Sequence, residues 1–372
     1  MALMLRNLGL LLTVTCFNAH CVLGKGKISC KDHKGSDVDW FVLYKLPKTR
    51  PTSGDYMSLN GEQMVYRDNR AKQNTWILLN GSIYNTFNNP VKETLDPIYN
   101  KEKDVAYVTY NDQLPDGFKG TRGGHTKGVL MAGIQSKQGA VWLQHSVPRF
   151  VENVEKGYVY PNSGRENGQL FFCMSTHVRY ADIIATHLFV QAANVYQTNA
   201  PAWAEKFSVF WRLLHKEYPH RTPKELTVDF LMTNKKTSHG DREASKLAER
   251  YLHPGARSPD ERQHCCPVVA NGAGGAQTKH CSKSYSVTDV SVIGVKTAKG
   301  SAVFSSREDH SKWYVTRHKG VFCFSSLNRM LSQMKRGGEI TCIIDIPLAD
   351  LFRKSIAERT SCKMNNKNGN IA

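Results

Sequence analysis

The feature that most constrains the fold of this chain is a series of short apolar segments separated by charged and turn-forming residues. Each segment is only a few residues long, which is typical of strands and too short for a helix that crosses a bilayer. The predicted strands are residues 41–46, 106–110, 128–131, 140–143, 170–174, 226–232 and 340–346. Together they predict a mixed β-sheet.

Three longer segments between these strands carry apolar residues at helical spacing. The predicted helices are residues 178–196, 203–214 and 241–252. Residues 253–283 are rich in Gly, Pro, Ser and charge, so we expect a long surface loop there. A sheet flanked by helices places the chain in the α/β (α+β) class.

The first 24 residues have the layout of a secretory signal peptide. Arg6 precedes an apolar run at 8–14, and small residues surround the expected cleavage point near Gly24. Charged residues interrupt every later apolar run before it reaches the length of a membrane span, so no membrane insertion is expected. The sequence therefore predicts entry into the secretory pathway.

Cysteine usage agrees with that route. Eight of the ten cysteines follow the signal segment, and an even number in a secreted chain predicts disulfides whose pairing the sequence leaves open. Asn80, in Asn-Gly-Ser, is an N-glycosylation acceptor. The cluster 264–266 with 280–281 contains His and Cys, but adjacent cysteines lack the usual spacing of zinc ligands. We therefore expect no metal and no other cofactor.

The charge balance favours a polyanionic partner. The chain has 50 Lys and Arg against 32 Asp and Glu, a formal net charge of +18. Most exposed histidines would add to this charge at about pH 5, since their reference pKa is about 6.5. Nucleic acid and anionic membrane surfaces both fit such a protein. A basic stretch at 235–250 either follows a DNA backbone or is a solvated helix face.

Two His-x-Lys tripeptides, one in each half of the chain, are the candidate catalytic groups. They are His125-Thr126-Lys127 and His310-Ser311-Lys312. Residues i and i+2 of an extended segment share a side, so each tripeptide presents an imidazole beside an ammonium group. Gly123-Gly124 precede the first and would allow the backbone to approach a ligand closely.

Two such pairs brought together suit phosphodiester cleavage without a metal. One imidazole attacks phosphorus, the other protonates the leaving oxygen, and Lys127 and Lys312 hold the nonbridging oxygens. One histidine must be neutral and one protonated, which predicts an acid optimum. His145 is a third candidate because it ends a predicted strand. Any single histidine is more often structural than catalytic, so spacing alone leaves the site undecided.

At these residues the chain resembles deoxyribonuclease II, a family of the phospholipase D superfamily. The matching stretches are DVDWFVLYKLP at 37–47, GHTKGV at 124–129, HSVP at 145–148 and EDHSKW at 308–313. The resemblance spans nearly the whole mature chain, in the family's order. It implies two pseudo-symmetric phospholipase D-like lobes, mixed β-sheets flanked by helices, with the active site at their seam. We divide the chain into a signal peptide (1–24), an N-terminal lobe (25–200) and a C-terminal lobe (201–372).

The activity that the resemblance implies is endonucleolytic cleavage of DNA to 3′-phosphate and 5′-hydroxyl ends, in a lysosome or outside the cell. It assigns His125 as nucleophile, His310 as general acid, Lys127 and Lys312 as phosphate-binding groups and His145 as an assisting group. Chemically, the two histidine roles could be exchanged. DNA binding is expected to be mostly sequence tolerant, through the backbone. A homodimer is compatible with the sequence, which does not define an oligomeric state.

Further residues carry over from the family with one departure. The superfamily's usual aspartate after each His-x-Lys is absent, with Ala132 and Arg317 at those spacings, which disfavours a lipid-cleaving phospholipase. Asn328 is a candidate phosphate contact. The family's disulfide pattern implies the pairs Cys30–Cys173, Cys281–Cys362 and Cys323–Cys342 and leaves Cys265 and Cys266 unassigned.

Two alternatives to a digestive nuclease stay open. The scaffold could serve a secreted toxin of the same family, which would still cut DNA. It could also serve a cationic DNA-binding protein without turnover, although intact His125, Lys127, His310 and Lys312 argue against a dead enzyme.

Overall fold

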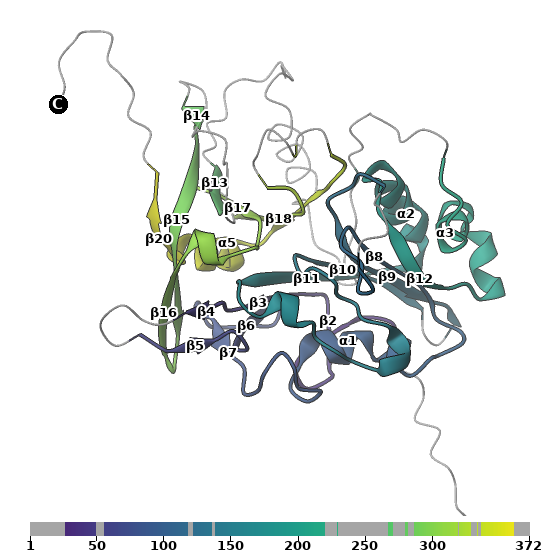
Figure 1. Cartoon of the computed structure of the whole chain (residues 1–372), viewed down its shortest axis with the longest axis horizontal. Helices are drawn as coiled ribbons and strands as arrows, with labels where there is room; N and C mark the ends of the chain where they lie inside the picture. Colours follow the sequence, from purple (N-terminus) through teal and green to yellow (C-terminus); the bar gives the residue numbers. More distant parts are fainter. Residues whose placement is uncertain are drawn as a thin grey trace, which may run out of the picture.

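The computed structural model describes residues 27–49, 56–117, 122–135, 138–219, 229, 267–270, 280–281, 286–318, 320–328, 333 and 336–360. Two large sheets, each of eight strands, account for most of this part of the chain, and a few helices lie against them (Figure 1). The predicted α/β (α+β) class is confirmed. The division into lobes at residue 200 and the likeness to phospholipase D stay predictions.

The first sheet has the strand order β12-β8-β9-β10-β11-β3-β6-β7, and every neighbouring pair is antiparallel. Its strands are β3 (Trp40–Lys45), β6 (Met64–Asp68), β7 (Ile77–Leu78), β8 (Ala106–Asn111), β9 (Lys127–Gly133), β10 (Gly139–His145), β11 (Gln169–Thr176) and β12 (Val195–Asn199). Two small hairpins lie beside it, β1 (Cys30–Lys31) with β2 (Asp37–Val38) and β4 (Lys48–Thr49) with β5 (Leu59–Asn60).

Both faces of the first sheet are covered. Every residue of β9, β10 and β11 is buried, as expected when alternate side chains point to two packed faces. Helix α1 (Pro90–Tyr99) packs on one face through Val91, Leu95 and Ile98. Helices α2 (Ala181–Val190) and α3 (Ser208–Leu214) pack on the other, as Figure 1 shows.

The second sheet comes from the C-terminal part of the chain. Its strand order is β14-β15-β13-β17-β18-β19, with β16 and β20 paired to β15, and only β13 and β15 run parallel among these described strands. The strands are β13 (Pro267–Ala270), β14 (His280–Cys281), β15 (Ser286–Thr297), β16 (Gly300–Ser305), β17 (Trp313–Thr316), β18 (Val321–Ser325), β19 (Ile340–Ile344) and β20 (Ile356–Arg359). Helix α5 (Ile346–Lys354) packs on β17 and β18.

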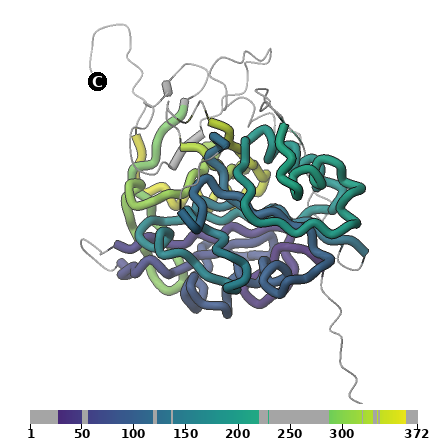
Figure 2. The backbone as a smooth tube through the Cα atoms, turned by 45° about the vertical axis from the view of Figure 1, so that its right-hand side comes forward, coloured from purple at the N-terminus to yellow at the C-terminus, as the bar shows by residue number. Residues whose placement is uncertain are grey.

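A single apolar core joins the two sheets. It contains Tyr44 and Trp76 from the first half and Phe304, Phe322 and Phe352 from the second. The Trp76 ring meets Phe352 edge to face at a centroid distance of 5.2 Å, and its Nε1 donates to Ser355 Oγ at 3.0 Å. The tube of Figure 2 shows the C-terminal segments lying against the N-terminal ones. Packing of this kind fixes the distance between the sheets.

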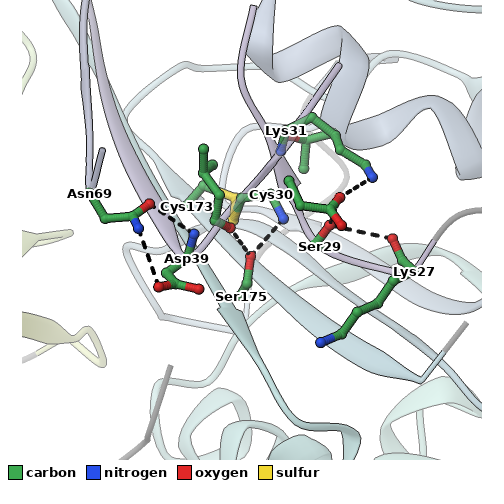
Figure 3. The surroundings of a disulfide bond; sticks show 11 residues. Lys27, Ser29, Cys30, Lys31, Asp39, Asn69, Cys173 and Ser175 are labelled. Atoms are coloured by element: carbon green, nitrogen blue, oxygen red, sulfur yellow. Dashed lines mark hydrogen bonds and ion pairs between the residues drawn. A yellow bond between two sulfur atoms is a disulfide. The ribbon is translucent and has the colours of Figure 1, made fainter. Parts of the chain in front are cut away.

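Two of the expected disulfides lie in the described residues and are confirmed. Cys30–Cys173 ties β1 to β11, and Ser175 beside it accepts from the Cys30 N–H and donates to the Val38 carbonyl (Figure 3). Cys323–Cys342 joins β18 to β19 at directly opposed positions. The pair Cys281–Cys362 stays a prediction, because Cys362, like Cys265 and Cys266, lies outside the described residues.

Three predicted elements need correction. The helix expected over 178–196 ends at Val190, because Ala192 has a positive φ and Val195–Asn199 pairs with β8 as strand β12. The strand expected to Ile346 ends at Ile344, since Asp345 caps helix α5. Residues 267–270 and 280–281, expected within a loop, are strands.

Of the other predicted elements, some are found in the structure and some lie outside the described residues. The predicted helix 203–214 divides into a 3₁₀ turn and α3. The signal segment, helix 241–252, the basic stretch 235–250 and all of strand 226–232 except residue 229 lie outside the described residues. No helix in the described part of the chain is both long and apolar enough to traverse a bilayer.

Candidate active site

Antiparallel pairing gathers the N-terminal candidates at one edge of the first sheet. Strands β8 and β10 end where β9 and β11 begin, so Asp112, Lys127, His145 and Gln169 follow or start neighbouring strands at the same edge. Asn111 faces Lys127, and Gln144 faces Gly128, in the strand register. Residues from four segments are thus brought together by sheet geometry alone.

The second sheet presents a matching edge. Strand β17 begins just after Lys312, β18 ends at Ser325 and β19 begins just after Glu339. The Ser325 N–H donates to the Lys312 carbonyl at 2.9 Å, and the Ser326 N–H donates to the Glu339 carbonyl at 3.1 Å. Ser326, Glu339 and the second His-x-Lys therefore lie at the edge that meets the first sheet.

His125 is held by the second half of the chain. Its backbone N–H donates to the Gly337 carbonyl at 2.8 Å, and its Nδ1 lies 2.6 Å from the Ser326 carbonyl oxygen. A carbonyl can only accept, so Nδ1 carries the proton. In the neutral ring, Nε2 therefore keeps its lone pair.

His310 is held by the first half in the same way. Its backbone N–H donates to the Gly168 carbonyl at 2.9 Å, and its Nδ1 lies 3.4 Å from Gln169 Nε2. Ser146 Oγ accepts from the Leu170 N–H and donates to Gln169 Oε1 at 2.6 Å, which turns the amide nitrogen toward His310. Nδ1 then accepts, and the neutral ring carries its proton on Nε2.

Lys127 is paired with a buried carboxylate. Asp112 forms an ion pair with Lys127, lies 3.3 Å from Arg336 Nη2 and 3.9 Å from His125 Nε2. The Asp112 and Lys127 side chains are 7% and 5% exposed, so solvent screens this pair little. These cations hold the pKa of Asp112 below its usual value although burial opposes them. Arg336 also donates to the carbonyls of Gly123 and Gly124.

Lys312 lies close enough to Lys127 and Asp112 for their charges to shift its pKa. Its Nζ donates to the His310 carbonyl at 2.5 Å. Burial and the Lys127 ammonium lower the pKa of Lys312 to about 7, while Asp309 and Asp112 raise it. The two ammonium groups therefore share one buried electrostatic environment.

The imidazoles respond to the same environment. Burial, then Lys127, lower the pKa of His125 to about 3, with a further contribution from Lys312. Burial, then Lys312 and Lys127, lower the pKa of His310 to about 4, and Lys45 adds to this effect. Each histidine is thus affected by the lysine of the other tripeptide. The structure brings the two pairs together into one cationic site.

His145 occupies a different position. It is 1% exposed and packs against Phe150 and Phe171, with ring centroids 5.3 and 5.6 Å away. Its Nδ1 accepts from the Val147 N–H, and burial lowers its pKa to about 3. His145 therefore lies behind Lys127 and Asp112 as a neutral ring, with no exposed edge for a substrate.

The structure also describes Asn328, Asn80 and Gly124, which the sequence analysis singled out. Asn328 is in the loop that holds His125, two residues beyond Ser326, and its Oδ1 is buried with no hydrogen-bond partner among the described residues. Asn80 is exposed, and its Oδ1 accepts from Lys299. Gly124 packs against the Gln191 carbonyl, which lies 2.2 Å from where a Cβ would be, so the fold itself requires this glycine. Close approach of this backbone to a ligand stays a prediction.

The central residue of each tripeptide makes buried contacts that the sequence did not suggest. Ser311 donates to Asp309, which also accepts from Tyr44 of strand β3. Thr126 meets Glu339 from the second half. Burial raises the pKa values of both Asp309 and Glu339. Within the described residues, no group of three or more His, Cys, Asp or Glu side chains is arranged to bind a metal.

Comparison with known proteins gives one consistent result. The family model described as Deoxyribonuclease II matches residues 29–362. Cell-death-related nuclease 7 of Caenorhabditis elegans is 32% identical over 94% of this chain and 92% of its own. Deoxyribonuclease-2-beta of Mus musculus is 30% identical over 95% and 98%. Plancitoxin-1 of Acanthaster planci is 28% identical over 94% and 97%.

The Asp112 carboxylate is expected to be essential for stability. Asp112→Asn leaves a buried Lys127 without its counter-charge, which we expect to lower the free energy of unfolding by about 3 kcal/mol. Urea unfolding at neutral pH measures this loss. Asp37→Asn is the matched control, because the Lys31–Asp37 pair is exposed and contributes less than about 1 kcal/mol. Equal losses in the two variants would contradict the structural role of Asp112.

Proposed function

The chain belongs to the deoxyribonuclease II family, and from that premise we propose that this deoxyribonuclease is a metal-independent acid endonuclease. It hydrolyses DNA phosphodiester bonds to 3′-phosphate and 5′-hydroxyl ends with its own histidines and lysines. The observation that carries the proposal is the reciprocal contact of His125 and His310 with the opposite half, which directs two imidazoles and two ammonium groups into one site.

The hydrogen bonds to Nδ1 favour one assignment of roles. His125 is the nucleophile, because its Nδ1–H donates to the Ser326 carbonyl and leaves a lone pair on Nε2. His310 is the general acid, because its Nε2 carries a proton in the neutral tautomer and in the imidazolium. Gln169 serves both states, since rotation of its amide offers a carbonyl oxygen to a protonated Nδ1.

The reaction then balances in two steps. His125 Nε2 attacks phosphorus, the P–O5′ bond breaks, and His310 transfers its proton to the leaving oxygen. Water next attacks the phosphohistidine, His310 takes the proton from that water, and the P–N bond breaks to release the 3′-phosphate. Lys127 and Lys312 stabilise the charge that develops on the nonbridging oxygens. Lys127 exchanges its contact with Asp112 for one with the substrate.

An acid optimum follows from groups that must carry a proton. His310 acts as an imidazolium with a pKa lowered to about 4, and Lys312 binds phosphate as an ammonium with a pKa lowered to about 7. Both active forms are lost as the pH rises. A bound phosphodiester offsets the lysine charges and so favours the His310 imidazolium. His145 is a positioning residue here, since its ring packs behind Lys127.

The biological setting rests on the N-terminal segment and the relatives. We propose that residues 1–24 direct the chain into the secretory pathway, that Asn80 is glycosylated, and that the enzyme acts in lysosomes or outside the cell. A secreted toxin is the second candidate, favoured by the likeness to Plancitoxin-1. A DNA-binding protein without turnover is disfavoured, because the four groups that the chemistry needs are present.

Purified protein is expected to nick plasmid at about pH 5 in excess EDTA, because His and Lys supply every charge and proton that the mechanism needs. His125→Ala and His310→Ala are each expected to lose at least about a hundredfold in rate. Agarose gels over a time course measure this loss. His215→Ala, an exposed histidine on the far end of α3, is the control and keeps the parent rate. Nicking that needs magnesium, or that survives both substitutions, would overturn the mechanism.

A substrate with a better leaving group separates the two histidine roles. In thymidine 3′-(p-nitrophenyl phosphate) the departing nitrophenolate needs no proton, so a general acid becomes dispensable. His310→Ala is expected to release a first-turnover burst of nitrophenolate at a rate within about tenfold of the parent, whereas its later turnovers stay slow because His310 also accepts the proton of the attacking water. His125→Ala is expected to give no burst. The absorbance of the released nitrophenolate measures the rates of the parent and of the two variants. A burst from His125→Ala in place of His310→Ala would reverse the assignment.

A further inference from the structure

Glu339 is a buried carboxyl group that the reaction described above does not use. It comes just before strand β19, and its backbone is fixed by Ser326, whose Oγ accepts from the Glu339 N–H at 2.9 Å. Its Oε2 lies 2.6 Å from Thr126 Oγ1, between the nucleophile His125 and Lys127. Its Oε1 is buried with no hydrogen-bond partner among the described residues. Glu339 therefore connects the second sheet to the centre of the first His-x-Lys.

The Thr126 hydroxyl contacts the oxygen atoms of two other side chains. Thr126 Oγ1 also lies 3.0 Å from Gln191 Oε1, and both Thr126 and Gln191 are almost fully buried. With Gln191 Oε1 toward Thr126, the hydroxyl has one proton for two oxygen neighbours, and a neutral Glu339 supplies the missing one by donating to Thr126. In this orientation Gln191 Nε2 has no partner among the described residues, so the count depends on how the amide is turned, and the burial of Glu339 carries the argument.

Ionisation removes that arrangement. A carboxylate would take the Thr126 proton from Gln191 Oε1 in this orientation, and it would place negative charge on a buried Oε1 that has no hydrogen-bond partner among the described residues. The Gln191 backbone matters as well, because Gly124 and Gly337 both pack directly against its carbonyl. The turn before His125 and the loop that holds His125 thus meet at the same residue.

Lys127, Thr126 and Ser326 favour the Glu339 anion, and its burial opposes ionisation. Lys127 is the cation that lowers its pKa, but this ammonium is already paired with Asp112. From strand β8, the buried Tyr110 hydroxyl faces it, and from the loop, Ser326 donates a side-chain contact. Burial outweighs these groups and raises the pKa of Glu339 to about 7.

We propose that Glu339 is a positioning residue that holds Thr126, and with it the first His-x-Lys, through a neutral carboxyl group, so that loss of this proton helps to inactivate the nuclease as the pH rises. The inference rests on the proposed function, since it concerns the geometry of the nucleophile. It adds to that function a residue which senses pH without touching the substrate.

The test is the pH profile of Glu339→Gln, in which the amide keeps the shape of the neutral carboxyl and cannot ionise. At about pH 5 the variant is expected to cut plasmid within about threefold of the parent. Above about pH 7, log kcat/KM is expected to fall less steeply in the variant than in the parent, by about one log unit per pH unit. At about pH 8 the variant is then roughly tenfold faster than the parent. Glu358→Gln, which removes an exposed carboxylate, is the matched control and keeps the parent profile.

Thermal unfolding gives a readout that does not depend on activity. A carboxyl whose pKa is raised on folding contributes stability at low pH that is lost as the pH rises through the folded value. Between about pH 4.5 and 7 the parent is therefore expected to lose stability relative to Glu339→Gln. This difference in stability does not depend on catalysis, so it is expected even if the histidine variants show that the proposed chemistry is wrong. Failure of the inference and failure of the proposed function can therefore be told apart.

Three results would overturn the proposal. One is a Glu339→Gln pH profile that superimposes on that of the parent, and another is a folded Glu339→Gln that is inactive at about pH 5, which would mean that the anion is needed. If the variant does not fold, infrared spectroscopy of the parent decides. A protonated carboxyl band that disappears as the pH rises past about 7 supports the proposal, provided that Asp309→Asn still shows this band at low pH. Absence of the band contradicts the proposal.

Discussion

The site depends on a reciprocal contact across the seam between the two sheets. The backbone of the second half holds His125 through Gly337 and Ser326, and the first half holds His310 through Gly168 and Gln169. Neither imidazole is oriented by its own half alone. The shared core around Trp76 and Phe352 therefore has a functional consequence, because it sets how the two sheet edges meet.

Burial and like charge together explain the electrostatics of the site. Lys127 and Lys312 lie in one poorly solvated environment, and both disfavour further positive charge on His125 and His310. Such a site stabilises an anion, and a phosphodiester supplies one. Asp112 comes from the neighbouring strand end and neutralises Lys127 in the free protein.

The sequence predicted the parts of the site that local pattern determines. The strands at 128–131, 140–143 and 170–174 and the two His-x-Lys tripeptides follow from alternation and spacing. Asp112, Gln169 and Glu339 were missed, because their roles depend on burial by segments far away in the chain, and nothing local separates them from surface residues. The end of helix α2 was missed for the same reason, since pairing with β8 makes 195–199 a strand.

The most direct test is a crystal structure at about pH 5 with a nonhydrolysable oligonucleotide bound. The account predicts one phosphorus between Nε2 of His125 and Nε2 of His310, with the ammonium groups of Lys127 and Lys312 on its nonbridging oxygens. Gly337, Ser326, Gly168 and Gln169 should keep their contacts with the two rings. A phosphorus bound beside one tripeptide alone, or imidazoles directed to separate surfaces, would contradict it.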